Sequence, residues 1–425
     1  MSGYTRRDVL KAAGSVGILA ASSSPFSVFA ASGVLANIDP TIHENKTLNM
    51  KPIPAGTVID ANNYKNFPEL EQFLPSNLAK RLKRGATRYD LPLPIKIMPT
   101  RKLRYDEPDR VWAEKNKGVV KLSDDNSKLI NWDAGIPFPE PRNIHEVSVN
   151  FYKRRFNGDS YKVYINFIVL DKADRRKDVA FTYWQKPWSG RTSLPPVPRY
   201  SDTDIDWKGT TLFTKPHDAK GFSILRFRYN DYNKTDDTWA YMPAIRRVRR
   251  FTGADVQDPL FGTDVTMDDY ANFEQKIDYK NIYPEKIELG QNLIYSYPDA
   301  HVDGNYVSKF DGKFMHVPGW EFRKYYKVTY RVTDKNYMYG SRVMWIDAET
   351  WLPVYSEFYD QKNNLYRSWN NLIWWTDDGK RNWANVEIVD WINGSKTFLL
   401  FKSEPYNFIY PDSVFTLEFL KSQGR

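Results

Sequence analysis

Residues 341–375 read SRVMWIDAETWLPVYSEFYDQKNNLYRSWNNLIWW, and this stretch decides the fold. Three runs rich in β-branched and aromatic residues are separated by two polar turns, Asp347–Thr350 and Asp360–Asn364. This pattern is typical of three consecutive antiparallel strands. Nine of the 35 residues are Phe, Trp or Tyr, against 16% of the whole chain. The excess predicts either an ordinary packed core or a surface that binds an apolar ligand.

More strands are expected on both sides of this stretch, because short runs of alternating apolar and polar residues recur along the chain. Tyr161–Val169 alternates most regularly, as a half-buried strand does. The other expected strands are Val179–Trp184, Phe222–Tyr229, Thr238–Met242, Arg247–Phe251, Lys286–Ile294, Arg323–Thr333, Asn385–Trp391 and Lys396–Lys402.

Helical spacing is limited to a few segments. Asn143–Phe156 carries an apolar side, Pro75–Gly85 reads as a short helix, and Pro411–Ser413 begins a short terminal helix. About ten strands with short links and few helices predict a mainly β fold of the α+β class. We expect a curved antiparallel sheet, or incomplete β-barrel, that is closed by a few helices.

One further helix is expected to begin at Thr266–Asp269, which has the composition of a capping sequence. Its two neighbouring residues Asp268 and Asp269 could act as a functional pair of carboxylates. At a helix start, however, we expect them to interact with the helix dipole. The apolar stripe of this helix consists of Tyr270, Phe273 and Ile277.

The first 30 residues have the features of a twin-arginine signal peptide. Arg6 and Arg7 precede a weakly apolar run, Ala12–Ala21, and Val28–Ala30 offers a cleavage site near Ala30. The run is too short and too rich in Ala, Gly and Ser to span a bilayer. The sequence therefore predicts export and a periplasmic location.

Composition divides the remaining chain in two. Residues 31–140 are rich in Pro and charge, and we expect them to form an irregular, partly helical N-terminal extension that packs on the body, residues 141–425. Gly135–Pro141 contains three prolines, which lack a backbone donor, so it is expected to be a connecting arm. Residues 141–425 are expected to form the open barrel.

Several classes of function are disfavoured by composition. The chain has no cysteine, which excludes disulfides, iron–sulfur clusters and thiolate metal sites. A net charge of +9 on 425 residues, without a recognised binding module, is a poor basis for nucleic-acid binding. No catalytic, metal-binding or cofactor-binding motif is present, and no metal-ligand spacing joins His43, His145, His217, His301 and His316.

Several pieces together resemble one bacterial family, the large exported proteins of unknown function (DUF1329) related to the outer-membrane lipoprotein-sorting carriers. The pieces are Gly135–Pro141, Thr238–Arg250, Arg342–Trp351 and Phe358–Arg367, of which Thr238–Arg250 is the most specific. The resemblance covers roughly residues 50–425. It implies an incomplete antiparallel barrel that holds acyl chains in its concavity. It also implies that the protein functions together with an exporter of the resistance–nodulation–division type. The twin-arginine signal and the long extension depart from the small carriers.

The sharpest cluster of charge is Arg246–Arg250, in which only Val248 is not arginine. On a strand Arg246, Val248 and Arg250 would point one way, and Arg247 and Arg249 the other. Guanidinium groups hold carboxylate or phosphate well, so Arg246, Arg247 and Arg249 are candidates for binding an anionic head group. The alternative is structural pairing with acids such as Asp236, Asp237 or Asp269.

Aromatic residues of the hairpin and of residues 341–375 are candidates for lining a hydrophobic cavity, with core packing as the alternative for each. They are Trp239, Tyr241, Trp345, Tyr355, Phe358, Trp369 and Trp374.

The leading hypothesis is a periplasmic, non-enzymatic carrier for a hydrophobic or amphiphilic, lipid-like ligand, which works with an envelope exporter or outer-membrane protein. One alternative is an exported enzyme or cofactor protein that acts on a hydrophobic substrate. The other is a scaffold subunit of an outer-membrane or exporter complex.

Overall fold

The computed structural model describes residues 53–423, apart from 83–86, 92, 101–106, 155–157, 201–203, 253–254, 270–281, 298–300, 303–304, 307–308, 317–318, 373–384 and 404–406. The predicted signal peptide, the body of the helix expected after Thr266–Asp269, and Trp374 lie outside the described residues. Among the described residues, no helix is long and apolar enough to cross a membrane.

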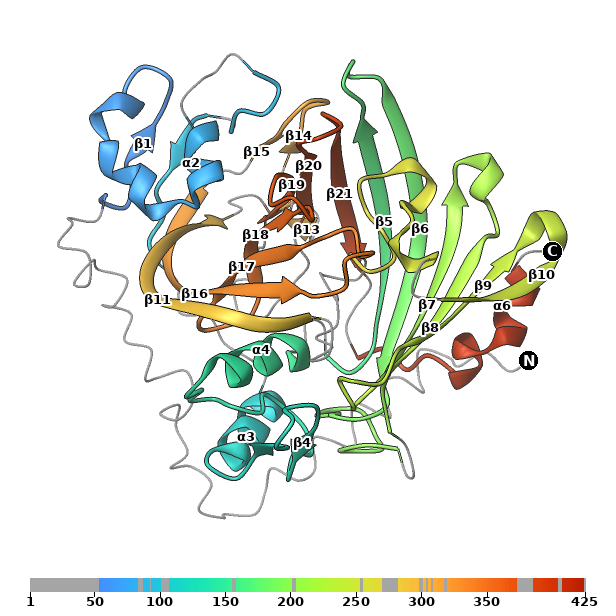
Figure 1. Ribbon diagram of the computed structural model, residues 1–425. Coiled ribbons are helices and arrows are strands. Elements are labelled where there is room, and N and C mark those ends of the chain that lie inside the picture. Colours follow the sequence, from blue (N-terminus) through green and yellow to red (C-terminus); the bar gives the residue numbers. More distant parts are fainter. Residues whose placement is uncertain are drawn as a thin grey trace.

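Thirteen of the described strands form one large antiparallel sheet, which curls without closing into a barrel (Figure 1). In spatial order they are β10 (Arg247–Phe251), β9 (Asp237–Met242), β8 (Ser223–Tyr229), β7 (Ile205–Lys215), β6 (Arg176–Pro187), β5 (Tyr161–Leu170), β21 (Lys396–Ser403), β20 (Asn385–Asp390), β19 (Leu365–Leu372), β18 (Pro353–Tyr359), β17 (Ser341–Asp347), β16 (Gly319–Val332) and β11 (Ile282–Tyr297). The prediction of a mainly β fold with a curved, open antiparallel sheet is confirmed.

Smaller elements surround this sheet. The short strand pairs are β1 (Val58–Ile59) with β2 (Ile95–Lys96), β3 (Lys121–Leu122) with β4 (Leu129–Ile130), β12 (His301–Val302) with β13 (Asn305–Tyr306), and β14 (Lys309–Phe310) with β15 (Met315–His316). The described α-helices are α2 (Ser76–Arg81), α3 (Glu107–Asn116), α4 (Ile144–Lys153) and α6 (Leu417–Gln423).

The stretch 341–375 forms β17, β18 and β19, as predicted for its described part. Polar side chains fix the two turns. Asp347 accepts hydrogen bonds from the backbone N–H groups of Glu349 and Thr350, at 3.0 and 2.8 Å. Asp360 accepts from those of Lys362 and Asn364, both at 2.8 Å. These local bonds satisfy backbone donors that the sheet cannot reach.

One face of the sheet carries a single apolar cluster, which we call the inner cluster. It joins residues from β5 to β9 with residues from β16 to β20, for example Phe167, Ile224, Tyr330 and Trp369. Strands so far apart in the sheet share one cluster because the sheet curls around it, and β11 contacts β19 in addition to its ladder partner β16. This face is therefore the concave side.

Helix α4 covers part of the inner cluster. Its N-terminus is capped by Asn143, whose side-chain oxygen accepts from the backbone N–H groups of His145 and Glu146, both at 3.0 Å. Val147 and Phe151 then face the cluster and are fully or almost fully buried. The predicted helix at Asn143–Phe156 is confirmed over its described part.

The outer, convex face carries separate clusters under separate segments. The N-terminal extension packs on β16–β18, where the ring of Phe73 meets that of Phe322 at 4.8 Å between centroids. The β14–β15 hairpin packs on β5 and β21 through Phe310. Helix α6 packs on β8 and β9, and the preceding turn, Asp412–Phe415, packs on β7. The division of the chain at residue 140 stays a prediction.

Two expectations from the pattern need correction. Strand β7 was not expected, because Gly209 lies at its centre and Lys215 at its end. A Cβ atom at Gly209 would lie 2.7 Å from the hydroxyl of Tyr183, so close packing between β6 and β7 favours glycine there. Arg246 does not alternate with Val248 on β10. It ends the Pro243–Ile245 turn in the left-handed region, with φ of 52°.

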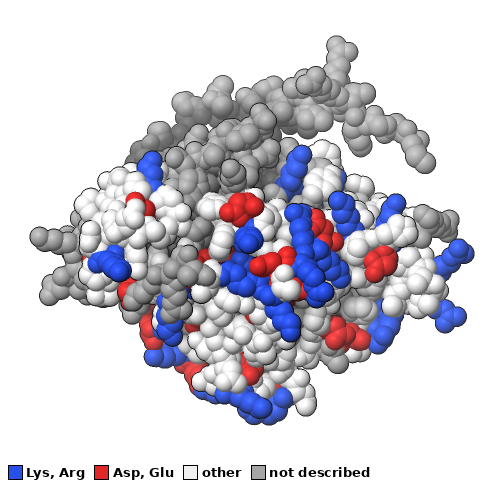
Figure 2. Space-filling model, turned by 90° about the horizontal axis from the view of Figure 1, so that it is seen from above, with Lys and Arg blue, Asp and Glu red and all other residues white. Residues whose placement is uncertain are grey.

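The turns of six hairpins lie at one end of the sheet, because the strands that lead into them are parallel to one another across the antiparallel order. Two of these hairpins are β16–β17 and β18–β19, and the other four are consecutive along the sheet. These four join β5 to β6, β7 to β8, β9 to β10, and β20 to β21. The β5–β6 turn points up in Figure 1, and Figure 2 views the molecule from that side.

The contact between the extension and the sheet predicts a stability effect. Leu78 on α2 is 1% exposed in the apolar cluster between the N-terminal extension and β16–β18, so Leu78→Ala should lower the free energy of unfolding by about 2–4 kcal/mol. Val58→Ala is the matched control, because Val58 is 46% exposed and should cost less than about 1 kcal/mol. Denaturant unfolding measures both; equal effects would mean that the extension is not docked as described.

Candidate functional site

Residues 255–269, which we call the strap, cross one end of the inner cluster. On one side the ring of Phe261 packs on Phe213 and Phe222, with centroids 4.7 and 5.2 Å apart. On the other side the side-chain oxygen of Gln257 accepts from the backbone N–H of Met338 at 2.8 Å. The strap thus links β7 and β8 to the β16–β17 turn, across the opening of the curled sheet.

The end of the strap has the geometry of a helix cap. The Thr266 hydroxyl accepts from the backbone N–H of Asp269, and the Asp269 carboxylate accepts from the backbone N–H of Thr266, both at 3.2 Å. This reciprocal pair fits the predicted capping sequence. It also fixes the direction of the Asp269 side chain, which turns into the protein.

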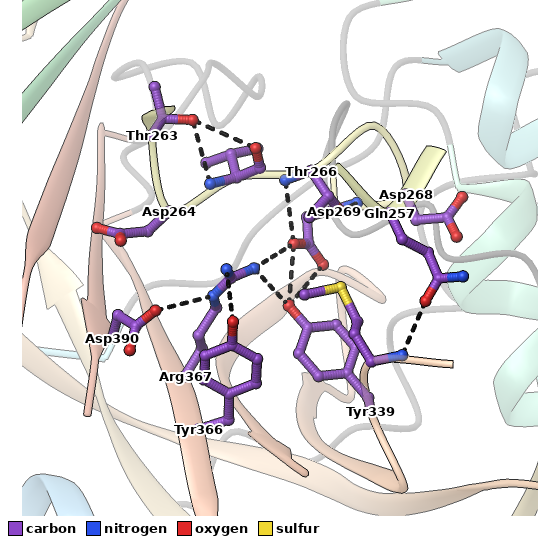
Figure 3. Close-up of polar contacts among 12 residues, drawn as sticks. Gln257, Thr263, Asp264, Thr266, Asp268, Asp269, Tyr339, Tyr366, Arg367 and Asp390 are labelled. Carbon is purple, nitrogen blue, oxygen red and sulfur yellow. Dashed lines mark hydrogen bonds and ion pairs between the residues drawn. The ribbon is translucent and has the colours of Figure 1, made fainter. Parts of the chain in front are cut away.

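Asp269 meets a buried arginine from β19 (Figure 3). Arg367 Nη1 lies 3.2 Å from Asp269 Oδ2 and donates to the Tyr339 hydroxyl at 2.9 Å. The Tyr339 hydroxyl in turn donates to Asp269 at 3.0 Å. Asp269 and Arg367 are 1% and 2% exposed and Tyr339 is fully buried, so this triangle lies out of water. A buried ion pair of this kind resists separation, because either partner alone would leave a desolvated charge.

Neighbouring groups complete the surroundings of Arg367. Its Nη2 donates to the Tyr366 hydroxyl at 3.2 Å, and its Nε lies 3.6 Å from Asp390 Oδ2 on β20. The ladders place Arg367 opposite Asp390 on one side and opposite Phe358 on the other. Arg342 lies opposite Phe358 from β17. The inner face therefore carries Phe358 between two buried guanidinium groups.

Two strap carboxyls are not ion-paired in this way. Asp268 is held by the Tyr337 hydroxyl, which donates to it at 2.9 Å. Burial raises the pKa of Asp268 to about 6, against an opposing pull from Arg226. Asp264 accepts from the hydroxyls of Ser395 and Thr397 at 2.5 and 2.7 Å, and burial raises its pKa as well.

The network holds the strap rather than presenting reactive groups. Burial raises the pKa of Asp269, and it raises those of Tyr337 and Tyr339 well above their ordinary value, so both phenols stay protonated hydrogen-bond donors. In the part of the chain that the structure describes, no three His, Asp or Glu residues gather as a metal site would require. The arrangement can close the inner face, and its carboxyls can take up protons.

The predicted aromatic residues do not form one cluster. Phe358 and Trp369 lie in the inner cluster. Trp345 and Tyr355 face outward against the N-terminal extension, with their rings 5.4 Å apart. Trp239 and Tyr241 face outward against α6. Trp374 lies outside the described residues, and of the six that the structure describes, two lie on the concave side.

Of the predicted arginines, Arg247 and Arg249 lie on β10 at the free edge of the sheet, and Arg246 lies in the turn before it. Arg247 and Arg249 are opposite Met242 and Ala240, which puts them on the inner face. Arg249 pairs with Asp255 of the strap at 2.8 Å. Arg250 lies on the outer face and pairs with Asp237, one of the acids considered for structural pairing. All four arginines of the cluster are exposed.

A groove of about 390 Å³ lies elsewhere, between the β16–β17 and β18–β19 turns. Arg331, Lys335, Asp360 and Gln361 line it together with smaller residues, and none of the predicted aromatic residues does. Its polar lining is unlike a site for an apolar ligand.

The sequence did not reveal the partners of Asp269. Arg367 was part of a family piece, and Asp268 and Asp269 were read as a helix start. The available signal was a charged residue in β19, flanked by aromatic residues that predict burial. A charge on a buried strand face requires a partner.

The Arg367–Asp269 pair gives a first prediction. Asp269→Asn should lower the free energy of unfolding by about 3 kcal/mol, because Arg367 loses its nearest strap carboxylate in a buried position. Asp264→Asn, on the same strap, removes no ion pair and should cost about 1 kcal/mol or less. Urea unfolding of the two variants distinguishes them; equal losses would show that the pair does not hold the strap.

Asp268 gives a prediction for pH. Its pKa rises from 3.8 to about 6 on folding, so the folded state binds this proton more tightly. The contribution of Asp268 to the free energy of unfolding is fully present below pH 4 and is lost as pH rises through 6. At pH 7 the free energy of unfolding is therefore about 3 kcal/mol lower than it would be with this contribution. Asp268→Asn removes the titration. The variant should therefore gain melting temperature over the natural protein at pH 7.5 but not at pH 4. A difference that is the same at both values would contradict this.

Comparison with known proteins places the chain in a family. The family profile of DUF1329, a protein of unknown function, matches residues 58–420. An uncharacterized protein of Pseudomonas aeruginosa is 22% identical over 325 residues, which are 73% of this chain and 70% of that protein.

Solved structures give weaker likenesses. A DUF1329 family protein from Desulfovibrio piger is 18% identical with a TM-score of 0.45, over 65% of this chain and 96% of that chain. A LolA superfamily protein from Nitrosomonas europaea is 16% identical with a TM-score of 0.42, over 66% of this chain and all of the other. The family match spans most of the sequence and confirms the resemblance carried by Thr238–Arg250 and the other pieces: this chain belongs to the DUF1329 family.

Proposed function

We propose that this protein is a periplasmic carrier that holds a hydrophobic or amphiphilic molecule against the inner face of its curled sheet. The observation that carries the proposal is the way this face is covered. One continuous apolar cluster spans the concave side, and the segments that cover it include α4, the strap, and Ala113 and Ile136 of the N-terminal extension, rather than a second sheet. Single segments can move aside at lower cost than a sheet, whose ladders must break together.

The strap is the cover that opens in this proposal. Its polar contacts, from Gln257 to Met338 and from Asp269 to Arg367, are discrete and can be exchanged for water. Its apolar contacts, such as Leu260, Val265 and Met267 in the inner cluster, can be replaced by a ligand of similar character. An acyl chain would recover about 0.8 kcal/mol for each buried methylene.

The inner aromatic residues are the ligand contacts that we propose. Phe358 and Trp369 are 1% and 2% exposed on the concave side, close to the Arg367–Asp269 pair. Trp239, Tyr241, Trp345 and Tyr355 already pack against other segments of the same chain.

The head group would lie at the free edge of the sheet. Arg247 and Arg249 point to the inner face beside the beginning of the strap, where Arg249 contacts Asp255. Guanidinium groups suit a carboxylate or phosphate. We therefore propose an anionic amphiphile, with its chain under the strap and its head group at β10.

Export through the twin-arginine route and cooperation with an exporter or outer-membrane protein are further parts of the proposal. They rest on residues 1–30 and on the family resemblance. The export route is proposed from residues 1–30, which lie outside the described part of the chain, and the exporter or outer-membrane partner is proposed from the resemblance.

Protein purified from the periplasm tests the proposal by native mass spectrometry and lipid extraction. We expect a bound amphiphile, and uptake of a fluorescent fatty acid after delipidation. Arg247→Gln with Arg249→Gln should weaken fatty-acid binding about tenfold or more, but not binding of the neutral alcohol of equal chain length. Arg250→Gln, on the outer face of the same strand, is the control. Protein that carries no amphiphile and takes up no fatty acid would contradict the proposal.

A further inference from the structure

We propose that the turns of four neighbouring hairpins form a docking surface for a bilayer that contains anionic phospholipid. We call this surface the rim. It consists of the exposed residues at or next to the turns β5–β6, β7–β8, β9–β10 and β20–β21. Docking here is a further property, separate from ligand binding.

The topology brings these turns together. β5 to β10 are consecutive neighbours in the sheet, and β21 is hydrogen-bonded to β5. Neighbouring strands are about 5 Å apart, so successive hairpin turns lie about 10 Å apart along one edge. Four turns in a row make a broad surface rather than a pocket. A broad surface of this kind suits a membrane.

The rim carries an excess of positive charge, part of which is visible in Figure 2. Apart from Arg247, which lies on the inner face of β10, its exposed basic residues are Lys172, Arg175, Arg176, Lys177, Lys215, Lys220 and Arg246. Its acidic residues are Asp171, Asp174, Asp178 and Asp218, so seven cations face four anions, a net charge of +3.

Some of these charged side chains form ion pairs within the protein, and others do not. Arg175 pairs with Asp171 at 2.7 Å, and Arg176 with Asp178 at 2.6 Å. Among the residues that the structure describes, Lys172, Lys220 and Arg246 have no ion-pair partner. One available cation therefore stands at each of three successive turns.

Two exposed apolar side chains distinguish this surface from a site for an acidic protein. Ile245 at the β9–β10 turn is 57% exposed, and Ile392 at the β20–β21 turn is 55% exposed. They stand singly, at opposite ends of the row of turns. Isolated isoleucine side chains among cations do not form the continuous apolar patch that a packed protein interface requires. They can, however, enter the boundary between head groups and acyl chains of a bilayer.

The rim also surrounds the strap. Lys177 Nζ, at the β5–β6 turn, donates to the backbone oxygen of Phe261 at 2.6 Å. Ser395, at the β20–β21 turn, donates to Asp264. A membrane docked on the rim would therefore face the strap end of the inner cluster. This last consequence rests on the proposed function, whereas docking itself does not.

Vesicle binding by the full chain tests docking. The protein should sediment with phosphatidylcholine vesicles only when they contain phosphatidylglycerol, and salt should weaken the binding. Lys172→Gln, Lys220→Gln and Arg246→Gln together should lower the partition coefficient about a hundredfold, at about fivefold per charge. Lys65→Gln, Lys115→Gln and Lys121→Gln together are the control, because they remove the same charge from exposed positions away from the rim.

The absence of cysteine allows a second readout. Either Ile245→Cys or Ile392→Cys introduces the only thiol in the chain, which can carry an environment-sensitive fluorophore. Its emission should shift to the blue with anionic vesicles. The same label at Val119, which is 50% exposed near α3, should not respond.

Three results would overturn the proposal. They are no binding to anionic vesicles, equal losses in the two triple variants, and a response at position 119 rather than at 245 and 392. Binding of poly-glutamate that depends on the rim, without vesicle binding, would assign the surface to an acidic protein instead. Each outcome is separate from ligand binding, because amphiphile retained by the purified protein is measured without vesicles.

Discussion

The buried pair of Arg367 and Asp269 is the interaction on which the closed inner face depends. A guanidinium group on the concave side of β19 cannot be left without a counter-charge. Asp390 at 3.6 Å supplies part of it, and Asp269 brings the rest from the strap. The strap must therefore cross the inner cluster for Arg367 to be satisfied. The same requirement orients Tyr339, whose hydroxyl joins both groups.

Curvature of the sheet sets the context for this pair. Because strands from β5 to β20 share one concave cluster, a few segments, among them the strap and α4, cover a large apolar surface. On the convex side, separate segments each cover a few strands. The hydrogen bonds and ion pair among arginine, carboxyl and tyrosine are directional, so they can break and re-form in one defined geometry. Apolar contacts are not directional and define no such geometry. This difference is why we place the ligand on the inner face.

Much of the fold was predictable from the sequence, and the assignment of faces was not. The turns at Asp347 and Asp360 identified β17–β19, and Asn143 identified the start of α4. Period-two alternation shows that neighbours such as Trp345 and Ile346 point to opposite faces of the sheet. The residues on both faces are apolar here, so the pattern cannot say which face is the inner one. Gly209 concealed β7 because the contact that needs it, with Tyr183, comes from another strand. Arg367 and Asp269 are 98 residues apart, beyond any local signal.

Photo-crosslinking tests the central claim most directly. A fatty acid with a photoreactive group at the end of its chain would be bound and irradiated, and the modified peptides identified by mass spectrometry. We expect labelling of the inner-face residues around Phe358 and Trp369, together with the strap. Labelling confined to the outer residues Trp345 and Tyr355, or to Trp239 and Tyr241, would contradict it.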